Sequence, residues 1–173
     1  MALCPAALSA QERAVWETAG VSIPLAAEME VQASGSDMFT ARGGGITLHM
    51  RVVRDAGHPF VETLTDRARE IDRLAEERIA PSTGNVPDAF FDYLQERGYH
   101  PGGHSREVFF PVDHGIVGYM TESVDPEDKV LVAVLYSRTQ NIPFILVARF
   151  PEIRGRNVGE MLMRLSTTAS PDR

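Results

Sequence analysis

Two arginines interrupt strand-like runs of the sequence and are the residues best suited to bind a ligand. Arg51 lies within residues 46–54 (ITLHMRVVR), and Arg149 lies within the apolar run of residues 144–150. A strand arginine must meet an anion or reach water, because burying an isolated charge costs several kcal/mol. The guanidinium is a planar fork that can hold a carboxylate or phosphate through two hydrogen bonds. Both arginines are therefore candidate contacts for a small anion. The alternative is a place on the solvent face or, for Arg51, an ion pair with Glu62 or Glu107.

Other polar side chains on the neighbouring predicted strands can complete such a site. His49 shares a strand face with Arg51, where it can supply a hydrogen bond or a proton, although a satisfied sheet histidine is the simpler interpretation. Tyr136 lies on a separate predicted strand and can line the same pocket, and Arg138 follows it as a further ligand-binding candidate. The alternative for Arg138 is a cross-strand salt bridge with Glu107.

A metal site is not expected. His100, His104 and His114 fall within fifteen positions, but a proline and two glycines between the first two prevent the helix that would align them. We interpret them as loop or surface histidines. The single cysteine, Cys4, excludes an intramolecular disulfide and a cysteine zinc cluster. No cofactor is indicated.

The composition excludes several classes of protein. The chain has 173 residues, enough for one domain with a real core, and a net charge of −7 from 24 acidic and 17 basic residues. This acidic balance argues against a surface that coats nucleic acid, where affinity comes mainly from phosphate neutralisation. No apolar run approaches the roughly 18–20 residues of a membrane span. The N-terminus lacks the basic region of a signal peptide, so we expect a soluble, cytoplasmic protein without membrane contact.

The first half of the sequence mixes short helices and strands. A capping pattern predicts a helix over residues 9–18, followed by weak strands over 21–33 and 37–41. The glycines of residues 42–45 are interpreted as a hairpin turn rather than a phosphate loop, since a strand and not a helix follows them. Alternation makes 46–54 the first firm strand.

The expected elements continue with a second strand and two helices. Residues 60–65 are expected to pair back on 46–54, and 65–79 have helical spacing with a charged, solvated opposite face that includes Arg67. Asn85 is expected to cap a short helix that Gly98 ends.

The second half is dominated by strands. We predict strands over residues 106–111, 129–137 and 144–150, and a final helix over 157–165. Residues 113–121 fit either a strand or a helix. Strands grouped with helices at the margins indicate an α+β fold with a largely antiparallel sheet and flanking helices.

From about residue 46 to residue 157, the sequence resembles the UTRA domain. This is the ligand-sensing domain of GntR-superfamily, HutC-type transcriptional regulators, and it shares its fold with chorismate lyase. The resemblance rests on four stretches in the family's order: ITLHMRVVRDAGHPFVETL, AFFDYLQERGYHPGGHSREV, PVDHGIVGYMTESVDPEDKVL and VLVAVLYSRTQNIPFILVARFPEIRGRN.

The resemblance implies a domain division and a set of partners. Residues 46–173 would form a UTRA-like small-molecule-binding domain with a chorismate lyase-like fold, and 1–45 an N-terminal extension packed on it. By analogy, residues 113–120 would be a helix, and the protein would form a homodimer. The 45 residues are too few for the family's winged-helix domain and lack a helix-turn-helix pattern, so this chain is not expected to bind DNA directly.

The resemblance also implies roles for individual residues. The strand arginine at the Arg51 position faces the ligand cavity in related domains. A strand glutamate matching Glu107 accepts hydrogen bonds from ligand groups there, and its alternative is a salt bridge with Arg106 or Arg138. Chorismate lyase has a glutamate near the position of Arg149, so a cation in its place favours binding of an anion over elimination of pyruvate.

Three functions remain open at this point. The leading expectation is binding of a small anionic metabolite by a free-standing UTRA-like effector domain connected with transcription regulation. The alternative is an enzyme, a lyase or related acid–base catalyst on a carboxylate substrate, in which Arg51 and Arg149 hold the substrate while Glu107 or His49 moves a proton. The third is a partner-binding module whose apolar strand edges serve dimerisation.

Overall fold

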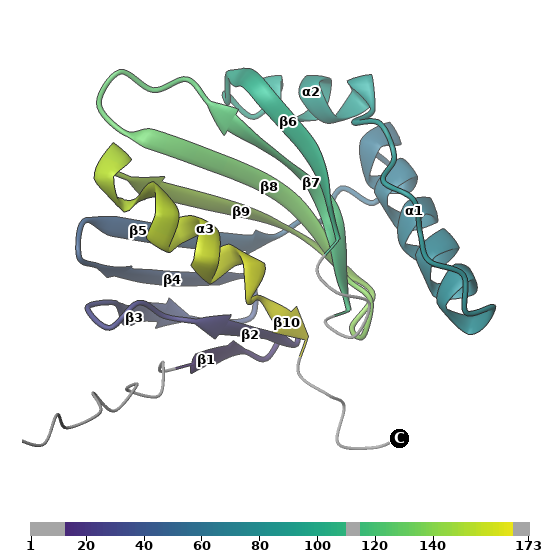
Figure 1. Cartoon of the computed structure of the whole chain (residues 1–173), viewed down its shortest axis with the longest axis horizontal. Helices are drawn as coiled ribbons and strands as arrows, with labels where there is room; N and C mark the ends of the chain where they lie inside the picture. The colour runs from purple at the N-terminus through teal and green to yellow at the C-terminus, as the bar shows by residue number, and fades with distance from the viewer. Residues whose placement is uncertain (1–12, 110–114, 168–173) are drawn as a thin grey trace, which may run out of the picture.

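The computed structural model of the chain describes residues 13–109 and 115–167 (Figure 1). Its strands are β1 (Arg13–Trp16), β2 (Val21–Pro24), β3 (Glu30–Ser34), β4 (Met38–Gly43), β5 (Ile46–Val52), β6 (Pro101–Phe109), β7 (Ile116–Ser123), β8 (Lys129–Ser137), β9 (Ile142–Phe150) and β10 (Ser166–Thr167). The helices are α1 (Pro59–Glu76), α2 (Asp88–Gln95) and α3 (Gly155–Met163), with a 3-10 turn, η2 (Glu152–Arg154), before α3. No helix in the described ranges is long and apolar enough to cross a membrane.

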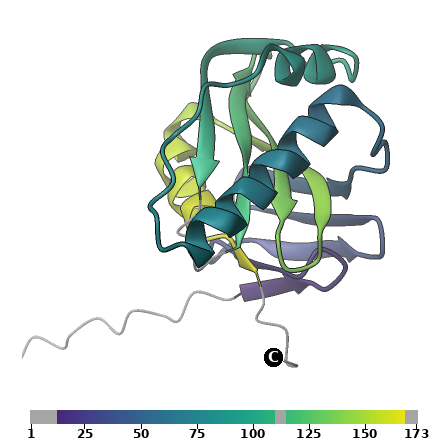
Figure 2. The same ribbon diagram turned by 90° about the vertical axis from the view of Figure 1, so that its right-hand side faces the viewer.

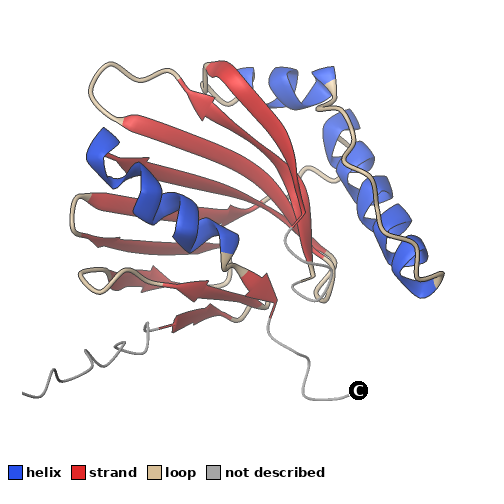
Figure 3. Cartoon of the chain, viewed as in Figure 1, coloured by secondary structure: helices blue, strands red, loops and turns tan. Residues whose placement is uncertain are grey.

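Seven of the strands form one antiparallel sheet with the order β3-β4-β5-β9-β8-β7-β6, and β1, β2 and β10 form a small second sheet. The helices α1 and α2 pack on one face of the large sheet, which we call the helical face. The helix α3 and the small sheet pack on the other face, which we call the α3 face (Figures 1 and 3). The expected α+β class with a largely antiparallel sheet is confirmed.

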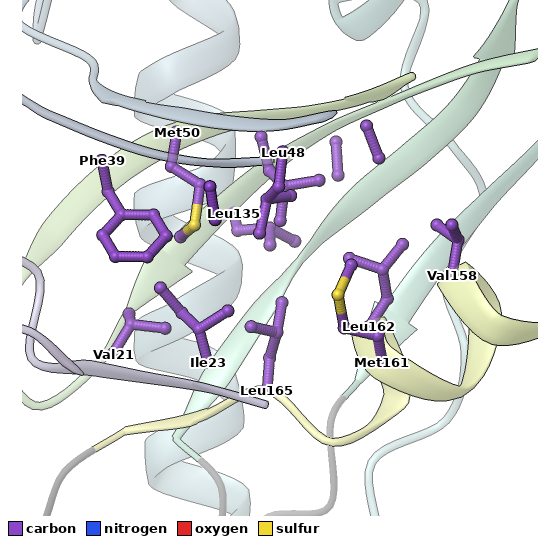
Figure 4. Packing of buried hydrophobic residues seen from close by; sticks show 14 of the residues in the cluster. Val21, Ile23, Phe39, Leu48, Met50, Leu135, Val158, Met161, Leu162 and Leu165 are labelled. Atoms are coloured by element: carbon purple, nitrogen blue, oxygen red, sulfur yellow. The ribbon is translucent and has the colours of Figure 1, made fainter. Parts of the chain in front are cut away.

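Alternation along the central strands decides which side chains enter which core. In β5, Ile46, Leu48 and Met50 are buried on the α3 face, whereas Thr47, His49 and Arg51 lie on the helical face. Figure 4 shows the α3-face core, where side chains of β4 and β5 approach those of β2 and α3. The facing predicted for the strand of residues 46–54 is therefore confirmed, and the strand itself ends at Val52.

The core of the helical face is built around aromatic rings. Phe60 of α1 lies 5.3 Å from the ring of Phe90, 5.1 Å from that of Tyr93 and 5.9 Å from that of Tyr119, measured between ring centroids. Figure 2 shows α1 running across the sheet from this side. The contacts of α1 and α2 are made mainly with β6, β7 and β8, so the helices cover one half of the face.

Several predicted elements are confirmed and others are wrong. The strands expected at residues 129–137 and 144–150, the helices expected after residues 65, 85 and 157, and the hairpin at 42–45 are all present, with Gly44 and Gly45 at φ of 58° and 79° in its turn. Residues 60–65 form the first turns of α1 and no strand, because Phe60, Val61 and Leu64 are spaced to bury one helical face. Residues 116–123 form strand β7, so the helix expected by analogy over 113–120 is wrong.

The N-terminal region differs most from expectation. Residues 13–16 form strand β1, which pairs with β2, where a helix over 9–18 was expected; the beginning of that expected helix lies outside the described residues. Strands β3 and β4 extend the same sheet as β5. The expected division at residue 45 therefore falls inside the β4–β5 hairpin.

Candidate functional site

A cavity of about 560 Å³ lies between the carboxyl-terminal ends of β5 and α2. Its floor is the helical face of β5 and β9, and one wall is the carboxyl-terminal end of α2. The lining residues are Asp37, His49, Arg51, Val52, Val53, Arg54, Asp55, Tyr93, Arg97, Tyr99 and Ile145. A volume of this size is sufficient for a small metabolite.

Arg51 is the cation of this cavity without a counter-ion. In the part of the chain that the structure describes, its guanidinium has no hydrogen-bond or ion-pair partner. The other two arginines of the cavity are paired, Arg54 with Asp37 and Arg97 with Asp55. The lining therefore carries one positive charge in excess, and that charge sits on the fork of Arg51.

The wall formed by α2 is held in place by stacking and by hydrogen bonds. The guanidinium carbon of Arg97 lies 3.4 Å from the ring centroid of Tyr93, one helical turn earlier. The Nη1 of Arg97 also donates to the carbonyl oxygen of Tyr93 at 2.9 Å. Ion pairing with Asp55 ties the same side chain to the segment after β5. Arg97 thus links α2 to the strand that carries Arg51.

His49 lies in the cavity lining beside Arg51, as the alternation predicts. Its Nδ1 lies 3.0 Å from Oγ1 of Thr40 on the neighbouring strand β4. This contact orients the ring, and it is the satisfied sheet histidine that the sequence left as an alternative. His49 can still offer its other ring nitrogen to a ligand in the cavity.

Arg149 is on the same face of the sheet but is not part of this cavity. In the β5–β9 ladder Arg51 is opposite Ile145, whereas Arg149 is opposite Thr47, four residues along the strand. Four strand residues span about 13 Å. Arg149 is exposed and its Nη1 lies 2.7 Å from Asp125 Oδ2, which lowers the pKa of that aspartate. The expectation that both arginines converge in one hollow is wrong, because the register places them at opposite ends.

Glu107 is also absent from the cavity, although a ligand contact or a pairing with Arg106 or Arg138 was expected. Its side chain is fully buried beneath α1 and accepts hydrogen bonds from Arg67, at 2.6 Å from Nε and 3.2 Å from Nη2. The amide of Gly84 also donates to it. Glu107 raises the pKa of Arg67 above its ordinary value. This carboxylate holds the helix and the following loop on the sheet.

The remaining candidates, Tyr136 and Arg138, lie under or beside α1. Tyr136 is buried in the helical-face core, and burial raises its pKa. The Nε of Arg138 donates to Asp72 of α1 at 2.7 Å. Of the candidates chosen from the sequence, the structure therefore brings together His49 and Arg51 alone.

Sequence reasoning missed the part of the cavity that α2 and the turns supply. Tyr93 and Arg97 are four residues apart on a predicted helix, a spacing that allows stacking and was a readable signal. Arg54, Asp37 and Asp55 lie in turns, where residue type alone does not reveal which groups meet. Among the described residues, no three His, Cys, Asp or Glu side chains are grouped to hold a metal ion.

The tyrosine of the cavity wall gives the protein a pH dependence at the alkaline end. Burial raises the pKa of Tyr93 to about 12. In the unfolded chain the phenol loses its proton near pH 10, so between about pH 10 and 12 the unfolded state binds fewer protons than the folded state. We expect the free energy of unfolding to fall through this window, by up to about 3 kcal/mol from this residue.

Urea unfolding at pH 9, 11 and 12 measures the effect. In Tyr93→Phe we expect the free energy of unfolding to decrease less steeply with pH, because the contribution of this phenol is removed. Tyr119 and Tyr136 have raised pKa values through burial as well, so part of the slope persists in that variant. An unchanged slope in Tyr93→Phe would show that this phenol does not titrate differently in the two states.

The fold is similar to that of a cyanobacterial protein of known structure. No protein-family model and no curated protein matches the chain. The solution structure of PsbP (CyanoP) from Synechocystis sp. PCC 6803 matches with a TM-score of 0.50 at 12% identity, covering 96% of this chain and 98% of that one. The Ran-binding protein Mog1p of Saccharomyces cerevisiae matches with a TM-score of 0.41 at 7% identity, over 91% and 95% of the two chains. At these identities the likeness to PsbP is one of fold alone.

Proposed function

We propose that the protein binds a small anionic metabolite in the cavity between β5 and α2, with Arg51 as the main contact for the anionic group. The observation that carries the proposal is the unpaired guanidinium of Arg51 in a cavity whose other two arginines are already paired. A bound carboxylate or phosphate would supply the missing counter-charge. Val53, Ile145 and Tyr99 provide apolar surface for the rest of the ligand.

The geometry favours binding over catalysis. Acid–base chemistry needs a titratable group within hydrogen-bond reach of the substrate. Glu107 lies under α1, and the two aspartates of the cavity are engaged by arginines. His49 remains in the lining as a group that can donate or accept a proton, and one of its nitrogens faces Thr40. The enzyme alternative therefore rests on His49 alone among the described cavity residues.

The UTRA-like relationship stays a prediction that rests on the sequence resemblance. In this proposal the chain acts as an effector-binding domain connected with transcription regulation, on a chorismate lyase-like scaffold. The expected homodimer likewise stays a prediction, which light scattering of the purified protein tests.

The test is a thermal-shift screen with sugar phosphates, amino acids and aromatic acids. A ligand at a hundred times its dissociation constant is expected to stabilise the folded protein by about 2.7 kcal/mol. For a chain of this size that corresponds to a rise in Tm of roughly 5–10 °C. Titration calorimetry of the best ligand then gives the affinity of each variant.

Arg51→Ala is expected to weaken binding about tenfold or more, because it removes a hydrogen bond to a charged group worth about 1.5–3 kcal/mol. Arg149→Ala is the matched control, since it is an exposed arginine on the same face of the sheet but outside the cavity. Equal losses in the two variants, or no ligand in the screen, would refute the proposal.

A further inference from the structure

Half of the helical face is left open by the helices. Across β4 and β5 this open face presents three cross-strand pairs: Met38 with Arg51, Thr40 with His49, and Arg42 with Thr47. Arg149 of β9 lies opposite Thr47 on the other side of β5 and extends this row of side chains. Met38, Arg42, Arg51 and Arg149 are exposed, and the Thr40, Thr47 and His49 side chains are partly exposed.

The open face carries an arginine at each end, with the Thr40–His49 pair between them. Of the described side chains, none forms a hydrogen bond or ion pair with the guanidinium of Arg42. Glu30 of β3 is its cross-strand neighbour, yet no ion pair joins the two. Among the described residues Arg51 at the other end has no hydrogen-bond or ion-pair partner either.

The spacing of these two arginines defines what could contact both. Arg42 is opposite Thr47, four residues before Arg51 in β5, so the two Cα atoms are separated by about 13 Å along the strands. A small metabolite in the cavity at the Arg51 end does not reach that distance. An extended peptide advances by the same rise per residue, so carboxylates four positions apart on it would match both guanidinium groups.

We propose that the open face docks an extended acidic segment of a partner protein, with one carboxylate at Arg42 and another at Arg51. The uncharged side chains of Thr40 and Thr47 supply hydrogen-bonding groups between the two contacts. A nucleic acid carries a negative charge at every nucleotide, so the acidic protein repels it more strongly than a segment with two carboxylates. The inference goes beyond the cavity function. It shares Arg51 with the cavity, but Arg42 belongs to the open face only.

Fluorescence anisotropy with a fluorescein-labelled hexaglutamate peptide tests this at low salt. Arg42→Ala and Arg51→Ala are each expected to raise the dissociation constant about threefold, as for loss of an exposed ion pair. The double variant is expected to raise it about tenfold, because the sites are distant enough to act additively. Raising the salt concentration to 0.3 M should weaken binding further. Arg156→Ala is the matched control: this exposed arginine lies on α3, behind the sheet, and pairs with Glu160.

The outcomes separate this inference from the cavity function. The docking surface is refuted if hexaglutamate does not bind, or if it binds Arg42→Ala as tightly as the wild type. The cavity function is still supported in that case if Arg51→Ala loses small-anion binding and Arg42→Ala keeps it. If an eight-nucleotide oligo(dT) binds more tightly than hexaglutamate and depends on the same arginines, the partner is a nucleic acid and the proposal is wrong. Small-anion binding that persists in Arg42→Ala, together with weakened hexaglutamate binding, supports the open face as a separate contact surface.

Discussion

Replacing Arg67 by methionine is expected to lower the free energy of unfolding by about 3–5 kcal/mol, the cost of leaving a buried charge without its partner. Glu107 has a side chain with 0% exposure, and Arg67 supplies two of the hydrogen bonds that it accepts. Methionine fills a similar volume without the charge. The carboxylate must then stay ionised without its ion-pair partner or take up a proton, and both cost stability. Urea unfolding at pH 7 measures the loss.

Two further variants make this prediction specific. The double substitution Arg67→Met with Glu107→Leu is expected to recover most of the stability, because it removes both charges together. Arg69→Met is the matched single control. Arg69 is two positions away on the same helix with 76% of its side chain exposed, and its change should stay within about 0.5 kcal/mol. A double variant as unstable as Arg67→Met would show that packing, and not the unpaired carboxylate, causes the loss.

The Arg67–Glu107 pair also explains why a ligand role for Glu107 was expected wrongly. A strand glutamate within an apolar sheet is a sound candidate for function, since burial of a carboxylate needs a reason. The reason here is an arginine forty positions earlier in the chain, on a helix face that the sequence indicated to be solvated surface. Periodicity assigns residues to a helix face, but it does not tell which part of that face meets a sheet. Contacts at this separation depend on the tertiary fold.

The sequence predicted the fold class and the central strands because these follow from local patterns. Alternation in residues 46–54 and the apolar runs that become β8 and β9 are decided by which side chains must be buried. The first turns of α1 were assigned to a strand because a turn precedes them and β-branched residues follow. Helical burial of Phe60, Val61 and Leu64 overrides that preference once β7 and β8 are in place.

The candidate site could be predicted only in part, because strand facing follows from the local sequence and strand register does not. Alternation correctly placed His49 and Arg51 on one face of β5. Whether Arg149 lies beside Arg51 depends on the register of β5 against β9, which is set by the whole sheet and by the turn before β9. A single sequence does not show the register. The arginines therefore lie on the same face of the sheet, but of the two it is Arg51 that lines the cavity.

Phe60→Ala is expected to cost about 3–5 kcal/mol and also to weaken anion binding in the cavity. The ring of Phe60 is fully buried and touches the rings of Phe90 and Tyr93 on α2. Truncation leaves a cavity that its neighbours fill only in part, which gives the large stability loss. Because Tyr93 carries the stacked Arg97, the loss of this contact also loosens the wall of the cavity. Urea unfolding and calorimetric titration of the best ligand measure the two effects.

Phe60→Leu and Ile153→Ala separate the two effects. Leucine keeps most of the apolar volume, so Phe60→Leu should cost less than half as much and leave ligand affinity within about twofold. Ile153 is 88% exposed, so its truncation should change neither quantity. If Phe60→Ala remains folded and binds as tightly as the wild type, the packing of α2 on α1 does not position the cavity wall. Reduced affinity in Phe60→Ala with normal affinity in Phe60→Leu would instead show that the aromatic core between α1 and α2 supports the wall of the cavity.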